Sequence, residues 1–350
     1  MGMSTLSPQF AIYAKTTDAW DAMFDACQKA KKSIYIEMYI VVDIKDTHDF
    51  ISLFCQKAKL GVHVVLLLDA WGSRKLSSRD RRELRDAGVE IRFFIKWFSF
   101  IHRKLIIIDD TIVFVGGVNL QPKAVAWFDL VVRITHGPTM QFKKMFARTY
   151  QMTKGENPLL LDFLLHPDRE TLGLQIIDHV PVLRYFKLRS YLTAKLQAAQ
   201  TRVVFTTPYL VPPTWFSEII HDLLKRGVEV VFLLPSWTDS IIIRRINPYY
   251  ATKYSKLGAK IYISQSMNHA KAMLVDNKEG MIGSGNIDNL SFDINSEIGV
   301  FFDDERAVAC LTRIFDTWEK ESILYTPDEH GLRWYHKLLL PILWILKPVL

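Results

Sequence analysis

The stretch IHRKLIIIDDTIVFVGGVN (Ile101–Asn119) places a histidine and a lysine at the start of an otherwise apolar, β-branched segment. The stretch HAKAMLVDNKEGMIGSGN (His269–Asn286) has the same order: His, one residue, Lys, four residues, Asp, an apolar run, Gly-Gly or Gly-Ser, one residue, and Asn. The His, Lys, Asp and Asn of the second copy each follow their counterparts by the same 167 residues. One such stretch could be accidental, but a shared offset at four positions indicates a duplicated unit.

The segments around each copy alternate between helical and strand patterns. We expect helices at 18–32, 46–60, 77–87, 184–200, 215–226 and one that runs through Leu257, and strands at 33–42, 62–69, 89–94, 202–210, 228–235 and 259–264. Gly61 in the first half and Gly227 in the second stand where a helix should end. The pattern predicts an α/β fold made of two copies of one unit, each a sheet covered by helices.

Prolines interrupt the patterning between residues 155 and 183, so the boundary between the units is expected there. We assign residues 1–165 to a first domain, residues 166–326 to a second, and residues 327–350 to a tail. The tail contains RWYHKLLLPILWILKPVL (Arg333–Leu350), a short apolar run broken by proline and flanked by aromatic and basic residues. Such a segment suits either an amphipathic helix in the lipid headgroup region or a helix docked on the protein's own core.

The 350-residue chain has 49% hydrophobic residues, enough for a substantial core, and a formal net charge of +7. The charge favours an anionic partner such as a phosphate-bearing small molecule, nucleic acid or an acidic membrane surface, although a mildly basic solvated surface would give the same value. Three widely spaced cysteines without a CxxC motif indicate reduced core thiols, not disulfides or zinc ligands. No apolar run reaches the ~20 residues of a spanning helix, and residues 1–17 have no signal-peptide pattern.

Alternate side chains on a strand share a face, so His102 and Lys104 should point the same way, and so should His269 and Lys271. The strand after each pair turns and returns beside it, which should bring the downstream Asn close to the histidine. If the two copies face each other about a pseudo-twofold axis, a single pocket receives two His, two Lys and two Asn. We therefore expect the active site at the interface of the two units.

The aspartates of the motif, Asp109 and Asp276, stand an odd number of residues beyond the His and Lys, in Asp-Asp and Asp-Asn turns. We expect them to form turns first, and we count them with the catalytic set as members of the motif. Each histidine also needs an acid that fixes its tautomer. Asp129 lies 27 residues after the first histidine and Glu297 lies 28 residues after the second, so we assign these two as the acids that orient the histidines.

Such a pocket suits phosphoryl transfer from a diester. Two ammonium groups and two amides can hold the non-bridging oxygens as charge develops. One imidazole can attack phosphorus and form a phosphohistidine, while the other protonates the departing alkoxide and later deprotonates the incoming hydroxyl. This scheme requires no metal ion and no other cofactor, and no carboxylate-rich magnesium motif is evident in the sequence.

The doubled HxKxxxxD pattern with a downstream GGxN or GSxN resembles the phospholipase D superfamily, over residues 33–319. Within it, the strings IEMYIV, LLLDAWGSR, TPYLVPP, LLPSWTDS and GSGNIDNLSFDINSE look most like bacterial cardiolipin synthases of the short branch without N-terminal transmembrane helices. The resemblance implies two pseudo-twofold-related α/β/α sandwich domains with mixed sheets. It also implies transphosphatidylation, in which phosphatidylglycerol gives its phosphatidyl group to a histidine, glycerol leaves, and a lipid alcohol accepts the group.

The resemblance places the nucleophile at His102 and the acid/base at His269, although the residues alone leave the two interchangeable. Lys104 and Lys271 complete the catalytic set. The residues implied in substrate binding are Asn119, Ser284, Asn286, Glu37, Tyr39 and Tyr209, with core packing equally open for the tyrosines. The chain departs from the family where Ile101 replaces an Asn and where WFD replaces WRD, and these changes concern the choice of substrate.

The segment KWFSFI puts Trp97, Phe98 and Phe100 immediately before the first histidine of the motif. Exposed, these rings would dip the pocket rim into a bilayer, as we expect; buried, they would cap the sheet. The expected partners are anionic phospholipids and the membrane surface at the cytoplasmic face, with no nucleic acid. Two alternatives stay open: a phosphodiesterase or nuclease that uses water as the acceptor, and a lipid-binding module without activity.

Overall fold

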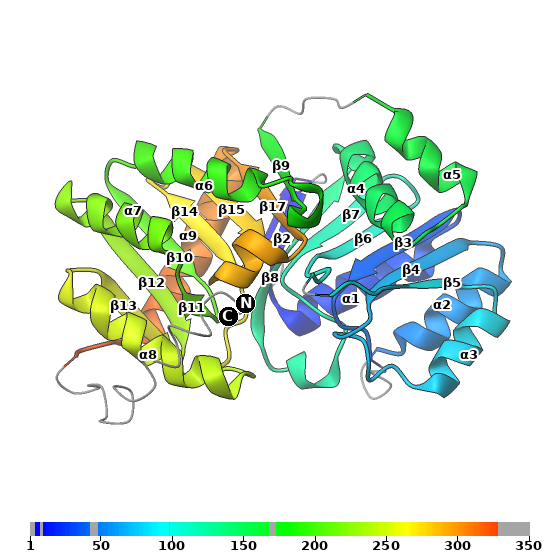
Figure 1. Ribbon diagram of the computed structural model, residues 1–350, viewed down its shortest axis with the longest axis horizontal. Helices are drawn as coiled ribbons and strands as arrows, with labels where there is room; N and C mark the ends of the chain where they lie inside the picture. Colours follow the sequence, from blue (N-terminus) through cyan, green and yellow to red (C-terminus); the bar gives the residue numbers. More distant parts are fainter. Residues whose placement is uncertain (1–3, 8–9, 43–47, 98, 168–172, 328–350) are drawn as a thin grey trace.

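The computed structural model describes residues 4–7, 10–42, 48–97, 99–167 and 173–327. Two eight-stranded sheets lie side by side, one from each half of the chain (Figure 1). The tail proposed for residues 327–350 falls outside the described residues except for its first residue, and Phe98 falls outside them too. The tail and the division between residues 165 and 166 therefore stay predictions.

The two sheets share one internal order. From edge to edge, the first contains β1 (Ser4–Ser7), β2 (Phe10–Lys15), β8 (Phe128–Thr135), β7 (Ile112–Gly116), β6 (Lys104–Ile108), β3 (Ser33–Met38), β4 (His63–Asp69) and β5 (Glu90–Phe94). The second contains β9 (Leu174–His179), β17 (Glu297–Phe302), β15 (Glu279–Gly283), β14 (Ala272–Val275), β10 (Arg202–Thr206), β12 (Glu229–Pro235), β13 (Lys260–Ser264) and β18 (Ile323–Leu324). Each has parallel pairs, such as β3 with β4 and β10 with β12, beside antiparallel ones, such as β3 with β6 and β10 with β14. The predicted duplication and the mixed sheets are confirmed.

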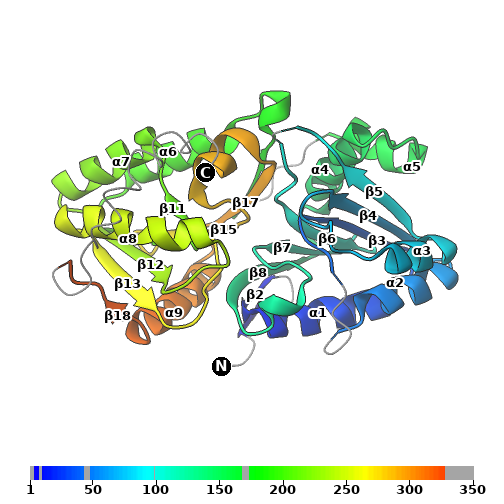
Figure 2. The same ribbon diagram turned by 60° about the horizontal axis from the view of Figure 1, so that its bottom comes forward.

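Helices cover both faces of each sheet, as Figures 1 and 2 show from two directions. On the first sheet, α1 (Thr16–Lys29), α2 (Phe50–Lys59) and α3 (Ser78–Asp86) cover one face, and α4 (Thr139–Met152) covers the other. On the second sheet, α6 (Lys187–Ala198), α7 (Thr214–Lys225) and α8 (Ile241–Lys256) cover one face, and α9 (Glu305–Lys320) covers the other. Strand alternation sets these sides, because Ile34 and Ile36 of β3 join the core under α1 while Tyr35 joins the core under α4. The predicted α/β/α sandwich is therefore confirmed in both halves.

The apolar side chains between α4, α9 and the inner faces of the two sheets form one continuous core. Aromatic rings cross the boundary between the halves: Phe10 meets Phe302 edge to face with centroids 5.4 Å apart, and Phe128 meets Trp318 at 6.0 Å. Separating the halves would expose this core to water, which is unfavourable in proportion to the apolar area. The core therefore holds the two halves in a fixed relation at the site between them.

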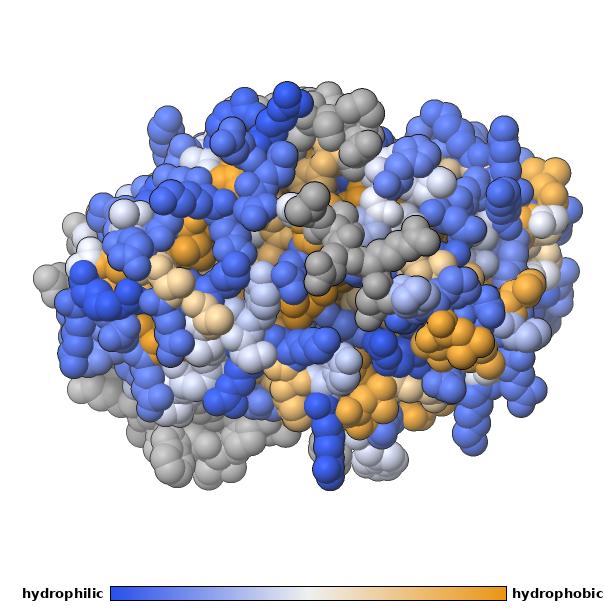
Figure 3. Space-filling view, turned by 90° about the horizontal axis from the view of Figure 1, so that it is seen from above, coloured by the Kyte–Doolittle hydropathy of each residue, from blue (hydrophilic) through white to orange (hydrophobic). Residues whose placement is uncertain are grey.

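The face seen in Figure 3 is mostly hydrophilic, with apolar side chains gathered in separate small clusters. Scattered exposure of this kind is ordinary for globular proteins. In the described part of the chain, no helix has both the length and the apolar character that crossing a bilayer requires.

Candidate active site

Both histidines of the doubled motif line one cavity of about 380 Å³ between the halves. His102 lies just before β6, and His269 lies just before β14, so equivalent strand ends deliver the two rings. Asn119 and Asn286, which follow β7 and β15, line the same cavity. The structure thus brings together the two His and two Asn that the sequence predicted to meet.

Each histidine is held by an acid from the opposite half. The Nδ1 atom of His102 lies 2.9 Å from Oε1 of Glu297, and Nδ1 of His269 lies 2.8 Å from Oδ2 of Asp129. Both acids are almost completely buried. Sequence spacing had related each acid to the histidine of its own half, whereas the structure pairs each acid with the histidine of the other half.

Short backbone bridges between the halves explain this crossing. The amide of His102 donates to the carbonyl of Ser296 (2.9 Å), and the amide of Ser296 donates to the carbonyl of Phe100 (2.8 Å). In the same way, the amide of His269 donates to the carbonyl of Phe128 at 2.7 Å. The residue before each acid therefore pairs with the segment that carries the opposite histidine, and the acid arrives beside that ring.

Burial and the acids together set the protonation states. Burial lowers the pKa of His102 to about 4, against the opposing effect of Glu297, and it lowers the pKa of His269 as well. Burial alone would raise the pKa of Glu297, but its contact with His102 holds it at about 2; the pKa of Asp129 is likewise held below its usual value by His269. At neutral pH both acids are thus ionised and both rings neutral. Each Nδ1–H then donates to its acid, and the Nε2 lone pair is free for chemistry.

The two lysines of the motif, unlike the two histidines and two asparagines, are not among the residues that line the cavity, and each bonds to the backbone of its own histidine. The Nζ atom of Lys104 donates to the carbonyl of His102 at 2.5 Å, and Nζ of Lys271 donates to the carbonyl of His269. Burial lowers the pKa of Lys104 to about 7 and that of Lys271 to about 8, and repulsion from Lys271 adds to the shift at Lys104. An anion between the two ammonium groups would offset the cost of burying two positive charges and would reduce the repulsion between them. This region therefore favours a phosphate.

Ser284 bonds to one of the acids and is not among the residues that line the cavity, and its assignment to substrate binding stays a prediction. Its hydroxyl donates to Oε2 of Glu297 and accepts the amide of Ile298 at 3.0 Å. The matching position in the first half is Gly117, where an added Cβ would lie 2.1 Å from Oδ1 of Asp129. The Gly-Gly and Gly-Ser variants of the motif thus fit the different lengths of the two acids.

The three family-based candidates for lining the pocket divide into two groups. Tyr39 and Tyr209 line the cavity, and the ring of Tyr39 stands edge-on to His102 with centroids 5.0 Å apart. Glu37 does not line it: this residue is completely buried, on the same face of β3 as Tyr35, which α4 covers. Burial raises the pKa of Glu37, while Arg103 opposes the shift. The structure thus places Glu37 beside Arg103 and not at the cavity, and its part in substrate binding stays a prediction.

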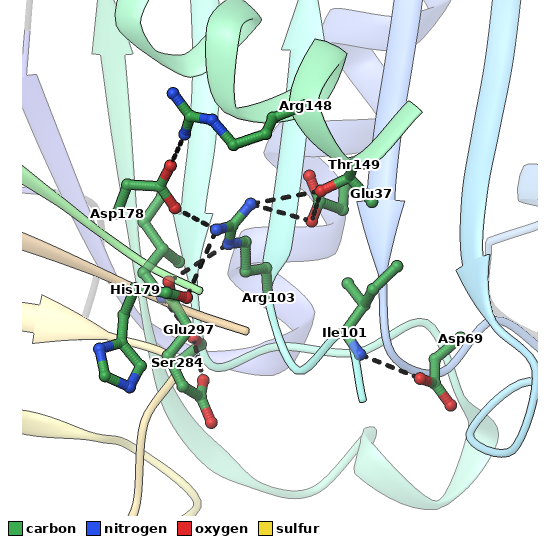
Figure 4. Close-up of polar contacts among 11 residues, drawn as sticks. Glu37, Asp69, Ile101, Arg103, Arg148, Thr149, Asp178, His179, Ser284 and Glu297 are labelled. Atoms are coloured by element: carbon green, nitrogen blue, oxygen red, sulfur yellow. Dashed lines mark hydrogen bonds and ion pairs between the residues drawn. The ribbon is translucent and has the colours of Figure 1, made fainter. Parts of the chain in front are cut away.

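Arg103, between the His and Lys of the first motif, received no role from the sequence. It is completely buried, and Figure 4 shows its guanidinium group between Glu37 and Asp178. Nη1 donates to Glu37 at 3.2 Å, Nη2 donates to Asp178, and Nε donates to the carbonyl of Glu297 at 3.2 Å. This side chain therefore ties β3 of the first half to β9 and β17 of the second. Strand alternation could have indicated it, since it must face away from the neighbouring His and Lys.

Asp109 and Asp276 lie at the far ends of β6 and β14 from the histidines, so the structure does not bring them into the site. Each occupies a turn with positive φ, 48° and 51° respectively. The carboxylate of Asp109 accepts the amides of residues 31–33, and that of Asp276 accepts the amides of residues 200–202. These contacts agree with the turn-forming interpretation and fix the start of the neighbouring strand.

The cavity also contains polar residues that the sequence analysis missed. Asp239, Asp288 and Asn295 all line it. Asp69 lies close by, where its carboxylate accepts the amide of Ile101 at 3.0 Å and so holds the approach to the first histidine (Figure 4). All four residues stand in the strings LLLDAWGSR, LLPSWTDS and GSGNIDNLSFDINSE, which were considered only as signs of family likeness.

Comparison with known proteins agrees with this geometry. Residues 23–150 and 192–318 match the family model "Cardiolipin synthase, PLD-like domain". The chain belongs to this phospholipase D-like family. The two matched segments contain the two motifs and leave out residues 151–191, which lie between them in the sequence.

Curated relatives carry the name cardiolipin synthase. One from Geobacillus sp. (strain WCH70) is 29% identical, covering 85% of this chain and 63% of the relative. Cardiolipin synthase A of Pseudomonas syringae pv. syringae (strain B728a) is 27% identical, covering 95% of this chain and 73% of the relative. This chain therefore spans less than two thirds of the first relative's length.

Solved structures share the fold. The crystal structure of phosphatidylserine synthase from Haemophilus influenzae Rd KW20 superposes with a TM-score of 0.76, covering 99% of this chain and 97% of that one at 14% sequence identity. At this identity the likeness concerns the fold alone. It extends through both halves, so that the whole two-sheet arrangement recurs in a solved protein.

Proposed function

We propose that this protein is a phosphatidyltransferase of the cardiolipin synthase type, which moves a phosphatidyl group from phosphatidylglycerol to the hydroxyl of a second lipid alcohol and releases glycerol. The observation that carries the proposal is the pair of neutral imidazoles at one cavity, each oriented by an ionised acid of the other half. Such a pair can divide the reaction between a nucleophile and an acid/base. The relatives named cardiolipin synthase support the same activity.

In the first step, Nε2 of His102 attacks the phosphorus of phosphatidylglycerol. A P–N bond forms, the P–O bond to glycerol breaks, and the departing oxygen takes a proton from Nε2 of His269. The phosphodiester brings a negative charge beside both rings, and this charge raises the pKa of His269 that burial holds low. Substrate binding thus favours protonation of His269, and this proton passes to the departing oxygen.

In the second step, the hydroxyl of the acceptor lipid enters where glycerol left. His269 Nε2 takes the hydroxyl proton as the oxygen bonds to phosphorus, and the P–N bond to His102 breaks. Both rings return to their starting states, so the cycle balances in protons and bonds. Glu297 stabilises the positive charge on His102 while the phosphohistidine exists.

The lysines and asparagines stabilise the charge that develops on the non-bridging oxygens. Lys104 and Lys271 bond to the backbone of the two histidines, and the amides of Asn119 and Asn286 line the cavity. Donors that are already in place need no reorganisation when charge develops, which is the main advantage of a preorganised site.

Access from a membrane is proposed through the rim of the cavity. Trp71 lines the cavity and is 62% exposed, and Trp97 on the loop after β5 is 89% exposed. On the second half, Ile241 is 74% exposed and lies between the cavity-lining residues Ser240 and Ile243. Apolar and aromatic groups of this kind suit the interface of a bilayer. We infer a peripheral protein on anionic phospholipid at the cytoplasmic face, in line with its net positive charge.

The decisive experiment incubates the purified full chain with phosphatidylglycerol vesicles and identifies the products by mass spectrometry. The expected products are cardiolipin and glycerol in equal amounts. Phosphatidic acid as the main product would instead mean that water is the acceptor, and no turnover would favour a binding module. His102→Ala should abolish turnover while binding to vesicles persists. His48→Ala, which changes a histidine outside the cavity, is the matched control and should retain turnover.

A further inference from the structure

One wall of the cavity carries hydrogen-bond acceptors that the proposed chemistry does not use. Asn286 and Asn295 line the cavity and are 5% and 6% exposed. Their Oδ1 atoms have no hydrogen-bond partner among the described residues. A buried acceptor without a donor costs free energy, and such groups in folded proteins call for an explanation. These two oxygens point to a ligand that brings hydrogen-bond donors.

Asp239 adds acceptors on the side of His269. Its Oδ1 accepts the hydroxyl of Tyr209 at 2.6 Å, and its Oδ2 accepts Nζ of Lys123 at 2.8 Å. Burial alone would raise the pKa of Asp239, but the nearby His269 and Lys123 hold it at about 2. The carboxylate is therefore ionised and compensated by Lys123, while each oxygen has a further lone pair that can accept from a ligand.

Asp288 adds a second carboxyl group to the same wall. It is 1% exposed, and its Oδ1 accepts the amide of Ser291 at 2.7 Å. Burial raises the pKa of Asp288 to about 7, with the charge of Glu297 acting in the same direction. Near neutral pH this group carries only part of a negative charge, and it can donate as well as accept.

Acceptors with little uncompensated charge suit neutral hydroxyl groups better than an ammonium group, which gains most from full negative charge. We propose that Asp239, Asp288 and the two asparagines form a polyol subsite, which holds the free hydroxyls of a glycerol headgroup while its phosphate lies between the histidines. This inference rests on the proposed function, because it concerns the alcohol that leaves in the first step and the alcohol that enters in the second.

The position of Asp239 fits both steps. His269 passes a proton to the glycerol oxygen as the P–O bond breaks, and later takes a proton from the acceptor hydroxyl as the new P–O bond forms and the P–N bond breaks. A carboxylate beside His269 is placed to accept from the other hydroxyls of the same alcohol. A site built on hydroxyl recognition discriminates strongly against an analogue that lacks the hydroxyl, because its acceptors are then left unpaired.

The test measures how one phosphatidyl-enzyme divides between two acceptors. The full chain is given a p-nitrophenyl phosphatidyl ester in detergent micelles, with glycerol and 1-propanol present at equal concentrations. The ratio of phosphatidylglycerol to phosphatidylpropanol does not depend on how fast the intermediate forms, so slower variants remain informative. The wild type should favour glycerol by about tenfold or more, the value of one or two lost hydrogen bonds to a charged group.

Asp239→Asn and Asp288→Asn should each lower this ratio about tenfold, toward equal products. Asp293→Asn is the matched control, since Asp293 is an exposed carboxylate on the turn that follows Asp288 and does not line the cavity. It should leave the ratio unchanged. If one variant fails to fold, the other variant still tests the subsite. The wild type also tests it, because its preference among the acceptors glycerol, 1,2-propanediol and 1-propanol should fall as hydroxyl groups are removed.

The outcomes separate this inference from the proposed function. Transfer to alcohols with the same ratio in wild type and variants would overturn the subsite and leave the phosphatidyltransferase standing. In a parallel competition between ethanolamine and glycerol, a wild-type preference for ethanolamine would assign the wall to an ammonium group and overturn the polyol assignment. Phosphatidic acid as the product with every alcohol would overturn the proposed function itself.

Discussion

Oε1 of Glu297 lies 2.9 Å from Nδ1 of His102, although 195 residues of chain separate the two. Asp129 makes the reciprocal contact with His269 at 2.8 Å, across 140 residues. Each half thus supplies the acid that sets the tautomer of the other half's histidine. Neither half holds a complete site, so the interface must form before either ring is oriented.

The crossed pairing predicts different kinetic defects for two conservative variants. Asp129→Asn should impair the acid/base His269, and Glu297→Gln should impair the nucleophile His102; each should lower kcat on phosphatidylglycerol about a hundredfold or more. With a p-nitrophenyl ester, whose leaving group needs no proton, Asp129→Asn should retain a rapid burst of p-nitrophenol and Glu297→Gln should lose it. Rapid-quench kinetics measures the burst, and equal bursts in the two variants would contradict the assignment of roles.

The sequence predicted contacts between residues that neighbouring strands of one half bring together. It missed contacts that form between the two halves. His102 and Asn119 were expected to meet because a strand, a turn and a returning strand bring them together. The partner of each acid depends on bridges between distant segments, such as Ile101 with Ser296, which no spacing within one half reveals. Glu37 was named through the family likeness and not from its strand. The sequence SIYIEM of β3 alternates polar and apolar residues, but all six are buried, so the alternation does not reveal which face lies toward the cavity.

Arg103 should be essential for stability and not for the chemistry itself. Arg103→Met leaves Glu37 buried without its cationic partner, and breaking a buried pair in this way typically costs roughly 3–5 kcal/mol. Chemical denaturation followed by circular dichroism measures the change. The double variant Arg103→Met with Glu37→Gln removes the stranded charge and should recover part of the loss; a double variant no more stable than the single one would argue against this pairing.

Asp109 should stabilise the fold in a pH-dependent way without affecting the site. Its pKa lies below the usual value because, although burial opposes the shift, three backbone amides donate to the carboxylate. A group whose folded-state pKa is depressed contributes stability above its unfolded-state pKa of about 3.9, and this contribution disappears as pH falls through the folded-state pKa. Asp109→Asn should therefore be less stable than wild type at pH 7 and nearly equal to it in strong acid.

Activity per folded molecule of Asp109→Asn should match the wild type, because Asp109 lies at the end of β6 remote from His102. Urea titrations at several pH values give the stability difference, and active-site titration with the p-nitrophenyl ester gives the folded fraction. A large loss of kcat in fully folded protein would place this aspartate in the chemistry after all.

With the p-nitrophenyl ester, whose leaving group needs no proton from His269, the pH dependence of kcat/KM should follow His102 and Lys104. His102 must be neutral to attack, and its pKa is about 4, so activity should fall as the pH drops through this value. Lys104 must be charged to hold the phosphate, and its pKa is about 7, so activity should also fall as the pH rises through this value. Lys104→Arg keeps its charge at every accessible pH and should move the alkaline limb up toward the pKa of Lys271, about 8, at some cost in maximal rate. An unchanged alkaline limb in this variant would assign that limb to another group.

The proposed membrane contact predicts that the rim of the cavity, and not apolar exposure in general, governs binding to vesicles. Trp97 is 89% exposed on the loop that leads to His102, and Trp97→Ala should weaken binding to anionic vesicles about tenfold, the value of one large apolar side chain removed from the bilayer. Leu159 provides a matched control: it is 70% exposed in α5 (Pro158–Leu161), on the outer side of the first half in Figure 1. Leu159→Ala should bind as the wild type does. Sedimentation with phosphatidylglycerol vesicles measures both, and turnover of a soluble diester should be equal in the two variants, because neither residue lines the cavity. Equal loss of vesicle binding in both variants would mean that the rim has no special place on the membrane.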